Sequence, residues 1–261
     1  MIERWGTKRF AAGLTLTYGL ALIAVLPPLS ALMQSFQPPA SEGWSGSAYR
    51  YVLDTYGSSL TFSLRLALFV VVASLLLGVP AAYGLVRHPF RGSRLVEQLT
   101  VVPLAVPGIS IAMAIIIGYS AQRGQWLLLA AGHMLYTVAY VVRIVMNTLR
   151  NLPLRELDDA ARTLGASRLD RLRRIVAPLL AAPVALASLI VFAISWGEFN
   201  VSFLLATPTQ LPFPAALYGT YTSNSGPVAA AATAIFLLGA LPLIIAVQLA
   251  GRSRFDYGQG A

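Results

Sequence analysis

Hydrophobic residues fill this chain in long uncharged runs, and short polar segments separate the runs. A helix that crosses a membrane needs about 20 mostly apolar residues, and six uncharged stretches reach this length. The pattern therefore predicts an all-α polytopic membrane protein with six transmembrane helices. The predicted spans are residues 10–33, 66–86, 98–122, 124–142, 175–197 and 228–250.

The composition agrees with a bilayer as the surrounding solvent. Hydrophobic residues make up 57% of the 261 residues and charged residues only 11%, whereas soluble domains carry roughly 25% charged residues. The net charge of +9 could suggest a nucleic-acid partner. However, Lys8 is the sole lysine, no long basic run occurs, and the arginines lie between apolar stretches. We therefore expect the lipid bilayer as a partner and no nucleic acid.

Several kinds of catalytic site are excluded by the residue types present. The chain has no cysteine, so disulfides, thiolate metal sites and a cysteine nucleophile are impossible. The two histidines, His88 and His133, are isolated, and we expect His133 to be a hydrogen-bonded helix-packing residue rather than a metal ligand. Lys8 does not stand in a phosphate-binding GxxxxGK[ST] loop. We expect a non-catalytic chain that binds no cofactor and does not hydrolyse ATP.

Arginines gather in alternate polar segments. Lys and Arg are enriched in short cytoplasmic loops of membrane proteins, and six spans with both termini inside satisfy this rule at every loop. The first span has basic residues before it, like a signal peptide, but its apolar core is long and no A-x-A site follows, so we expect an uncleaved helix. The basic residues of the predicted cytoplasmic segments are Arg4, Lys8, Arg9, Arg87, Arg91, Arg94, Arg150, Arg155, Arg162, Arg168, Arg171, Arg173, Arg174, Arg252 and Arg254.

Proline and glycine interrupt several apolar stretches. Proline removes a backbone donor and clashes with the preceding turn, so kinks are expected in the third span at Pro103 and Pro107. The uncharged segment 199–227 holds too many helix breakers for one span, and it is expected to be an outer loop or a re-entrant part of the substrate gate. Ser74 and Gly78 form a small-xxx-small spacing that could support close helix contact.

The polar loop 150–177 is long enough for two short helices. Helix formers follow Pro153, Gly165 stands where a left-handed cap would end the first helix, and Ser167 is a good N-cap for a second. Leu157, Ala160, Ala161 and Leu164 recur on one helical face. Such a face suits docking into a groove on a partner protein or lying on the membrane surface, and periodicity leaves both open.

The same loop carries a family resemblance. Asp159-Ala160-Ala161, then Gly165 after three residues, Ile175 after nine more, and Ala177-Pro178 resemble the EAA signature of ABC importer permeases, E-A-A-x3-G-x9-I-x-L-P. Asp159 replaces the usual glutamate, and Ala177 replaces leucine. Residues 103–108 and 196–200 are similar to stretches in the polyamine, aminoethylphosphonate and ferric-iron branch of these permeases.

The resemblance implies a type I ABC importer permease, a single domain over residues 1–261 with its six-span core at about 58–250, in a bacterial inner membrane. It also implies a second permease subunit, the same chain or a related one, and an extracytoplasmic substrate-binding protein. Two ATPase subunits would use ATP and Mg. Asp159 is expected to fix the loop through hydrogen bonds or an ion pair, and Gly165 to set its angle. The implied coupling residues are Asp159, Ala160, Ala161, Leu164, Gly165, Ile175 and Pro178.

The expected substrate path includes Arg65, Glu198 and Asn200. Ionisable groups inside a membrane usually face a cavity or a partner, although arginine can also snorkel to the interface. Glu198 could attract a cationic substrate at the outer mouth, pair with Arg65, or mark the interface. A small amine-containing or zwitterionic solute, such as a polyamine or aminoethylphosphonate, is the expected substrate.

Two other classes of function share some of these sequence features. A secondary transporter or half-transporter would also have six spans, but it usually needs an acidic coupling site near the midplane, and the predicted spans have no Asp or Glu there. An intramembrane enzyme would need a clustered nucleophile and base, or metal ligands, and neither is visible in the sequence.

Overall fold

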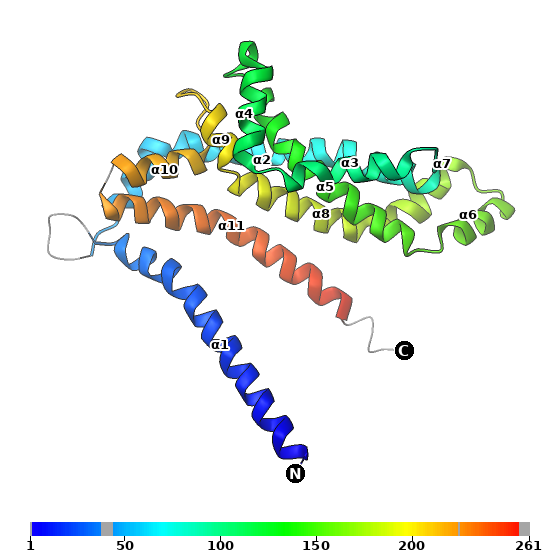
Figure 1. Cartoon of the computed structure of the whole chain (residues 1–261), viewed down its shortest axis with the longest axis horizontal. Helices are drawn as coiled ribbons and strands as arrows, with labels where there is room; N and C mark the ends of the chain where they lie inside the picture. Colours follow the sequence, from blue (N-terminus) through cyan, green and yellow to red (C-terminus); the bar gives the residue numbers. More distant parts are fainter. Residues whose placement is uncertain (1, 38–43, 224, 256–261) are drawn as a thin grey trace. The chain divides into compact units, whose positions relative to one another are not determined.

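The computed structural model describes residues 2–37, 44–223 and 225–255 and is helical throughout its regular elements (Figure 1). The predicted all-α fold is confirmed. The side chains of Arg4, Lys8, Arg9, Arg155, Arg252 and Arg254, which carry part of the predicted charge pattern, lie outside the described part. The elements are α1 (Ile2–Gln34), α2 (Ser47–Arg87), α3 (Ser93–Ala105), α4 (Gly108–Gly118), η1 (Ser120–Gln122), α5 (Trp126–Arg150), α6 (Leu154–Thr163), α7 (Arg168–Arg171), η2 (Leu172–Val176), α8 (Ala177–Gly197), α9 (Asn200–Leu205), α10 (Phe213–Ser223) and α11 (Gly226–Phe255).

Fewer spans meet the length and composition criteria than the sequence predicts. Within the described residues, four helical segments are long and apolar enough to cross a membrane, or up to five if one bent pair counts as a single span. The four are Gly13–Gln34, Ser47–Arg87, Trp126–Arg150 and Arg168–Gly197. The sixth predicted span corresponds to α11, whose described apolar part, Gly226–Pro242, is shorter than a full crossing.

The bent pair is the predicted third span. Instead of one kinked helix, the chain forms α3 and α4, whose axes differ by 103° (Figure 1). Val106 at the break is extended, with φ −90° and ψ 130°, because the ring of Pro107 disfavours helical backbone in the residue before it. By contrast, α1, α2 and α8 continue through Pro27 and Pro28, Pro80 and Pro183.

The contacts divide the chain into two compact units, where the sequence predicts one domain. The first contains residues 1–57 and 217–239, and the second contains 58–216 and 240–261. In the first unit, Ser35 shares a 2.7 Å hydrogen bond with Tyr49, and the Phe36 ring lies 5.1 Å from the Tyr49 ring. These contacts join the end of α1 to the start of α2.

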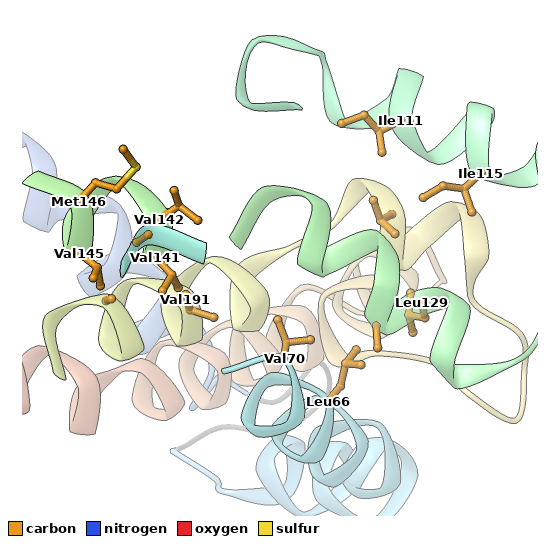
Figure 2. Close-up of a cluster of buried hydrophobic side chains, with 14 of the residues drawn as sticks. Leu66, Val70, Ile111, Ile115, Leu129, Val141, Val142, Val145, Met146 and Val191 are labelled. Atoms are coloured by element: carbon orange, nitrogen blue, oxygen red, sulfur yellow. The ribbon is translucent and has the colours of Figure 1, made fainter. Parts of the chain in front are cut away.

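The second unit holds a continuous hydrophobic core along α5 and α8. Val141 and Val145 of α5 are fully buried, as are Ala187 and Val191 of α8, so the two helices pack closely over several turns. Figure 2 shows these α5 side chains with Val191, and side chains of α2 and α4 that extend the same cluster.

Helices α2 and α5 approach closely through small residues. The Ser74 hydroxyl lies 2.8 Å from that of Thr137, and a Cβ on Gly78 would come within 2.7 Å of Val141. The contact moves four residues along α2, from Ser74 to Gly78, as it moves four residues along α5, from Thr137 to Val141. The two helices therefore run in the same direction at this contact. The small-xxx-small spacing of Ser74 and Gly78, which could support close helix contact, lies at such a contact in the structure.

The direction of α2 and α5 brings their carboxyl ends to one end of the second unit. Ion pairs, described below, bring the amino ends of α3 and α7 to the same place. We call this the loop end. It corresponds to the polar segments that the charge pattern predicts to be cytoplasmic.

We predict that Gly78→Ala destabilises the protein, because the new methyl group would overlap Val141. Overpacking of this kind costs about 1–3 kcal/mol. Gly84→Ala on the same helix is the matched control, since a Cβ there meets nothing within 4 Å, and it gains up to about 1 kcal/mol of helix propensity. Thermal unfolding in detergent measures both variants, and equal midpoints would contradict the close α2–α5 contact.

Candidate functional site

The loop 150–177 forms a glycine elbow between two helices, as the sequence predicts. Helix α6 ends at Thr163, and Gly165, two residues later, has a left-handed φ of 79°. The Ala166 amide donates to the Ala161 carbonyl at 3.0 Å, and the Gly165 amide donates to the Arg162 carbonyl at 2.9 Å. This pair of bonds is the Schellman motif, which satisfies the last carbonyls of the helix. Gly165 is therefore required by the backbone conformation, and not by space, since a Cβ there would meet nothing within 4 Å.

The second helix of the loop begins after Ser167, as predicted, but it does not stop at the end of the loop. The Ser167 hydroxyl accepts a hydrogen bond from the Asp170 amide and caps α7. From α7 the chain passes through the π-turn η2 into α8, so the loop helix and the predicted fifth span form one segment, Arg168–Gly197. Pro178, the second residue of α8, cannot donate a backbone hydrogen bond. The π-helix η2, which is wider than an α-helix, ends two residues before it.

The apolar face of α6 is largely unburied. Leu164 is 87% exposed and Leu157 is 37% exposed. Ala160 is also exposed, whereas Ala161 faces inward at 9%. A leucine so exposed at the tip of a polar loop has little to pack against within this unit, so the elbow presents an apolar tip that a partner surface could cover.

Asp158, which the sequence analysis did not single out, anchors the elbow. Its carboxylate pairs with Arg87 at the end of α2 and with Arg171 of α7, where Oδ1 lies 2.9 Å from Nη1. The three side chains are 19%, 24% and 14% exposed, so water screens these pairs less than ordinary surface pairs. One carboxylate therefore ties both helices of the elbow to α2.

The expected anchoring role of Asp159 is not what the structure shows. Its side chain is exposed, and no hydrogen bond or ion pair to it occurs among the described residues. Adjacent residues on a helix point about 100° apart, so Asp158 faces α2 while Asp159 does not. The signal that could have identified Asp158 was Arg87, an arginine at the end of a span with no acidic neighbour in sequence.

A second carboxylate joins α3 to α5 at the loop end. Glu97 binds Arg150 through both oxygens, at 2.9 and 2.7 Å, and it lies 3.9 Å from Arg143. Bidentate geometry makes this the stronger kind of arginine pair. Two acidic residues thus connect the helices at the loop end: Asp158 of α6 binds α2 and α7, and Glu97 of α3 binds α5.

At the far end of α8, a buried polar cluster surrounds His133. Its Nδ1 lies 2.9 Å from the Ser195 hydroxyl and its Nε2 lies 3.2 Å from the Ser202 hydroxyl. His133 is 1% exposed. The prediction of a hydrogen-bonded packing residue is confirmed, and this residue holds α5, α8 and α9 together.

Glu198 is buried rather than set in an open vestibule. It is 9% exposed, and its carboxylate accepts hydrogen bonds from the amides of Val201 and Ser202, at 3.0 and 2.9 Å. It thereby caps α9, where a negative charge is favourable, and lies 3.6 Å from His133. Arg65 is exposed and forms no ion pair among the described residues, so the considered Arg65–Glu198 pair is wrong for this structure.

Asn200 lies at the break between α3 and α4. A Cβ on Gly108 would come within 2.8 Å of the Asn200 amide nitrogen and 2.9 Å of the Tyr136 hydroxyl. The Tyr136 oxygen is buried without a hydrogen-bond partner among the described groups. Glycine at 108 therefore lets two polar side chains approach the start of α4, in the region predicted to border the substrate path.

Comparison with known proteins identifies the family of the chain. Residues 74–255 match the family described as binding-protein-dependent transport system inner membrane component. The chain is 30% identical over 195 residues to the spermidine/putrescine transport system permease protein PotC of Escherichia coli (strain K12), covering 74% of this chain and 73% of PotC. It is 25% identical over 260 residues to the putative 2-aminoethylphosphonate transport system permease protein PhnV of Salmonella typhimurium (strain LT2), covering 94% and 95%.

A sulfate transport system permease protein, CysT of Salmonella typhimurium, is 30% identical over 219 residues, covering 77% of each chain. The fold resembles that of a chain in the crystal structure of a bacterial ABC transporter involved in the import of the acidic polysaccharide alginate. The TM-score is 0.72 at 19% identity, over 91% of this chain and 94% of the other. The chain belongs to the family of binding-protein-dependent transport system inner membrane components, the non-catalytic permease subunits of ABC importers.

Proposed function

We propose that this chain forms half of the substrate path of an ATP-driven importer and couples it to a separate ATPase through the elbow of α6 and α7. The observation that carries this proposal is the combination of a fixed elbow and an exposed tip. The Asp158 pairs connect the elbow to α2, and Leu164 and Asp159 remain exposed for a partner.

The division of roles within the loop follows from these contacts. Leu164 with Ala160 supplies the apolar surface that enters a groove on the ATPase, and Asp159 supplies a charge that the ATPase binds. Ile175 lines, together with Arg87 and Asp158, a cavity of about 10 Å³ behind the elbow, and it supports the anchor from there. A cavity of this size holds about one water molecule at most, so little space is available to absorb a displacement of α6 before it reaches α2.

In this mechanism two ATPase subunits bind ATP and Mg and close together, while this chain binds neither. Each closing ATPase carries one elbow, and the elbows rotate the two permease subunits between inward-open and outward-open states. Both termini and the loop end face the cytoplasm, and an outer binding protein delivers the substrate.

For the substrate we propose a small amine-containing or zwitterionic solute. The names of PotC and PhnV support this class of substrate. The name of CysT, which is as similar in sequence, supports an anionic substrate instead. Asn200 and the Gly108 break are the proposed wall of the path, with Arg65 at its outer side. Glu198 acts on the path indirectly, because its carboxylate holds α9.

Uptake by proteoliposomes tests the function. The full chain is reconstituted with its partner permease, and spermidine, 2-aminoethylphosphonate and sulfate are offered with the binding protein, with and without the ATPase. We expect ATP-dependent uptake of an amine-bearing solute only when the ATPase is present. Uptake without the ATPase would contradict coupling, whereas ATP-dependent uptake of sulfate alone would overturn only the substrate class.

We predict that Asp158→Asn lowers the stability of the protein, whereas Asp159→Asn weakens its association with the ATPase. Asp158→Asn weakens two charge-assisted contacts and should lower the stability by about 1–3 kcal/mol. Its effect should be non-additive with Arg87→Gln, as expected of residues in contact. Asp159→Asn should change stability by less than about 0.5 kcal/mol but reduce co-purification of the ATPase. Thermal unfolding and pull-down yields measure the two effects, and equal behaviour of the two variants would refute the assignment.

A further prediction concerns Gly165. The left-handed backbone at this position strains a β-branched residue but is tolerated by asparagine, so Gly165→Val should abolish substrate-stimulated ATPase activity while Gly165→Asn retains most of it. Both variants should insert into the membrane at parental yield. Normal coupling in Gly165→Val would show that the elbow angle does not matter.

A further inference from the structure

A cavity of about 400 Å³ lies between the end of α2 and the elbow of α6 and α7. No step of the proposed transport mechanism uses it. Four arginines, one histidine and one carboxylate line it: Arg87, Arg162, Arg168, Arg171, His88 and Asp158. We call it the basic pocket.

The positive charge of the basic pocket is only partly balanced. Asp158 is shared between Arg87 and Arg171. Arg162 and Arg168 are exposed and form no ion pair within the described part of the chain. The guanidinium groups of Arg162 and Arg168, which no carboxylate of the described residues pairs, are suited to an anion with several oxygen atoms.

One wall of the basic pocket is apolar. Tyr83 comes from the last turns of α2, and Leu172 and Val176 come from η2. Leu172 is 45% exposed. These residues belong to two segments that are long and apolar enough to cross a membrane, Ser47–Arg87 and Arg168–Gly197, close to the end of one and the start of the other. The pocket therefore combines charge with an apolar wall, a combination that a phospholipid needs and a free phosphate does not.

The basic pocket is also separate from the exposed face of α6. Asp158 and Arg162 are four residues apart and share one face of the helix. At about 100° per residue, Leu157 and Leu164 lie on another face. A protein that covers only the leucine face would leave Asp158 and Arg162 uncovered.

We propose that the basic pocket binds the phosphate headgroup of an anionic phospholipid, with Arg162 and Arg168 contacting the phosphate and the wall of Leu172 and Tyr83 contacting the start of an acyl chain. Basic pockets between membrane helices bind such headgroups in other proteins. The proposal rests on membrane insertion of the loop end and does not depend on docking to the ATPase. A lipid bound there would lie against the Asp158 anchor and bias the elbow position.

Native mass spectrometry of the purified full chain tests the site. Phosphatidylglycerol and phosphatidylcholine with identical acyl chains are titrated separately, and inorganic phosphate serves as the competitor for a free-anion site. The pocket variant is Arg162→Gln with Arg168→Gln. The matched control is Arg91→Gln with Arg173→Gln, because these two exposed arginines belong to the same polar segments but do not line the pocket.

We expect the parent to prefer phosphatidylglycerol and the pocket variant to bind it about 30-fold more weakly, from about 1 kcal/mol per arginine. The control should change by less than about threefold, a smaller loss than one contacting arginine would cause. Equal losses in both variants, or no preference in the parent, would overturn the proposal in favour of diffuse surface charge. Displacement by millimolar phosphate would show a free-anion site. Unchanged lipid binding with lost ATPase co-purification would show a protein-binding surface instead.

Discussion

Charge pairing at the loop end is the interaction on which the elbow of α6 and α7, the proposed coupling element, depends. Arginines collect where helices leave the apolar segments, and their mutual repulsion would separate those ends without carboxylates between them. Asp158 draws together α2, α6 and α7, and Glu97 draws α3 to α5. The excess of arginine over acid leaves the same end positively charged, which gives rise to the basic pocket.

The opposite end of α8 is held together in a different way. Few charges are present there, and the contacts are hydrogen bonds among buried polar groups: His133 with Ser195 and Ser202, and Glu198 with the first amides of α9. In an apolar surrounding such bonds are favoured because the alternative is an unsatisfied polar group. The short helix α9 is thereby fixed against α5, and the break between α3 and α4 lies beside it through Gly108 and Asn200.

Much of this arrangement could be predicted from the sequence, because it depends on local chemistry. The elbow at Gly165 and the cap at Ser167 follow from residue types at short spacing. The contact of Ser74 and Gly78 with another helix follows from side-chain size, although the partner helix does not. A single proline in a span predicts a kinked helix, whereas Val106, Pro107 and Gly108 together separate α3 from α4, and the axes of these two helices differ by 103°.

The anchor could not be predicted as a pair. Arg87 at the end of a span indicates that a carboxylate partner is needed, but one sequence does not show which residue, 71 positions away, supplies it. Asp158 and Asp159 are chemically identical neighbours, and only the position of α2 decides which of them meets Arg87. The role of Glu198 was missed for a related reason. Its nearest partners are backbone amides three and four residues ahead, which become available only because a short helix begins after it.

The central claim is that the elbow and α2 move as one body, and a distance measurement tests it most directly. The chain has no cysteine, so spin labels at Ala81→Cys on α2 and Glu156→Cys on α6 are the only two in one copy of it, and both positions are exposed. Pulsed electron paramagnetic resonance on a transporter assembled with one labelled copy and cysteine-free partner subunits would give the distance between the two labels with and without ATP. The account predicts one narrow distance that ATP does not change. A distance that shifts or splits when ATP binds would show that the elbow moves against α2, and it would contradict the account.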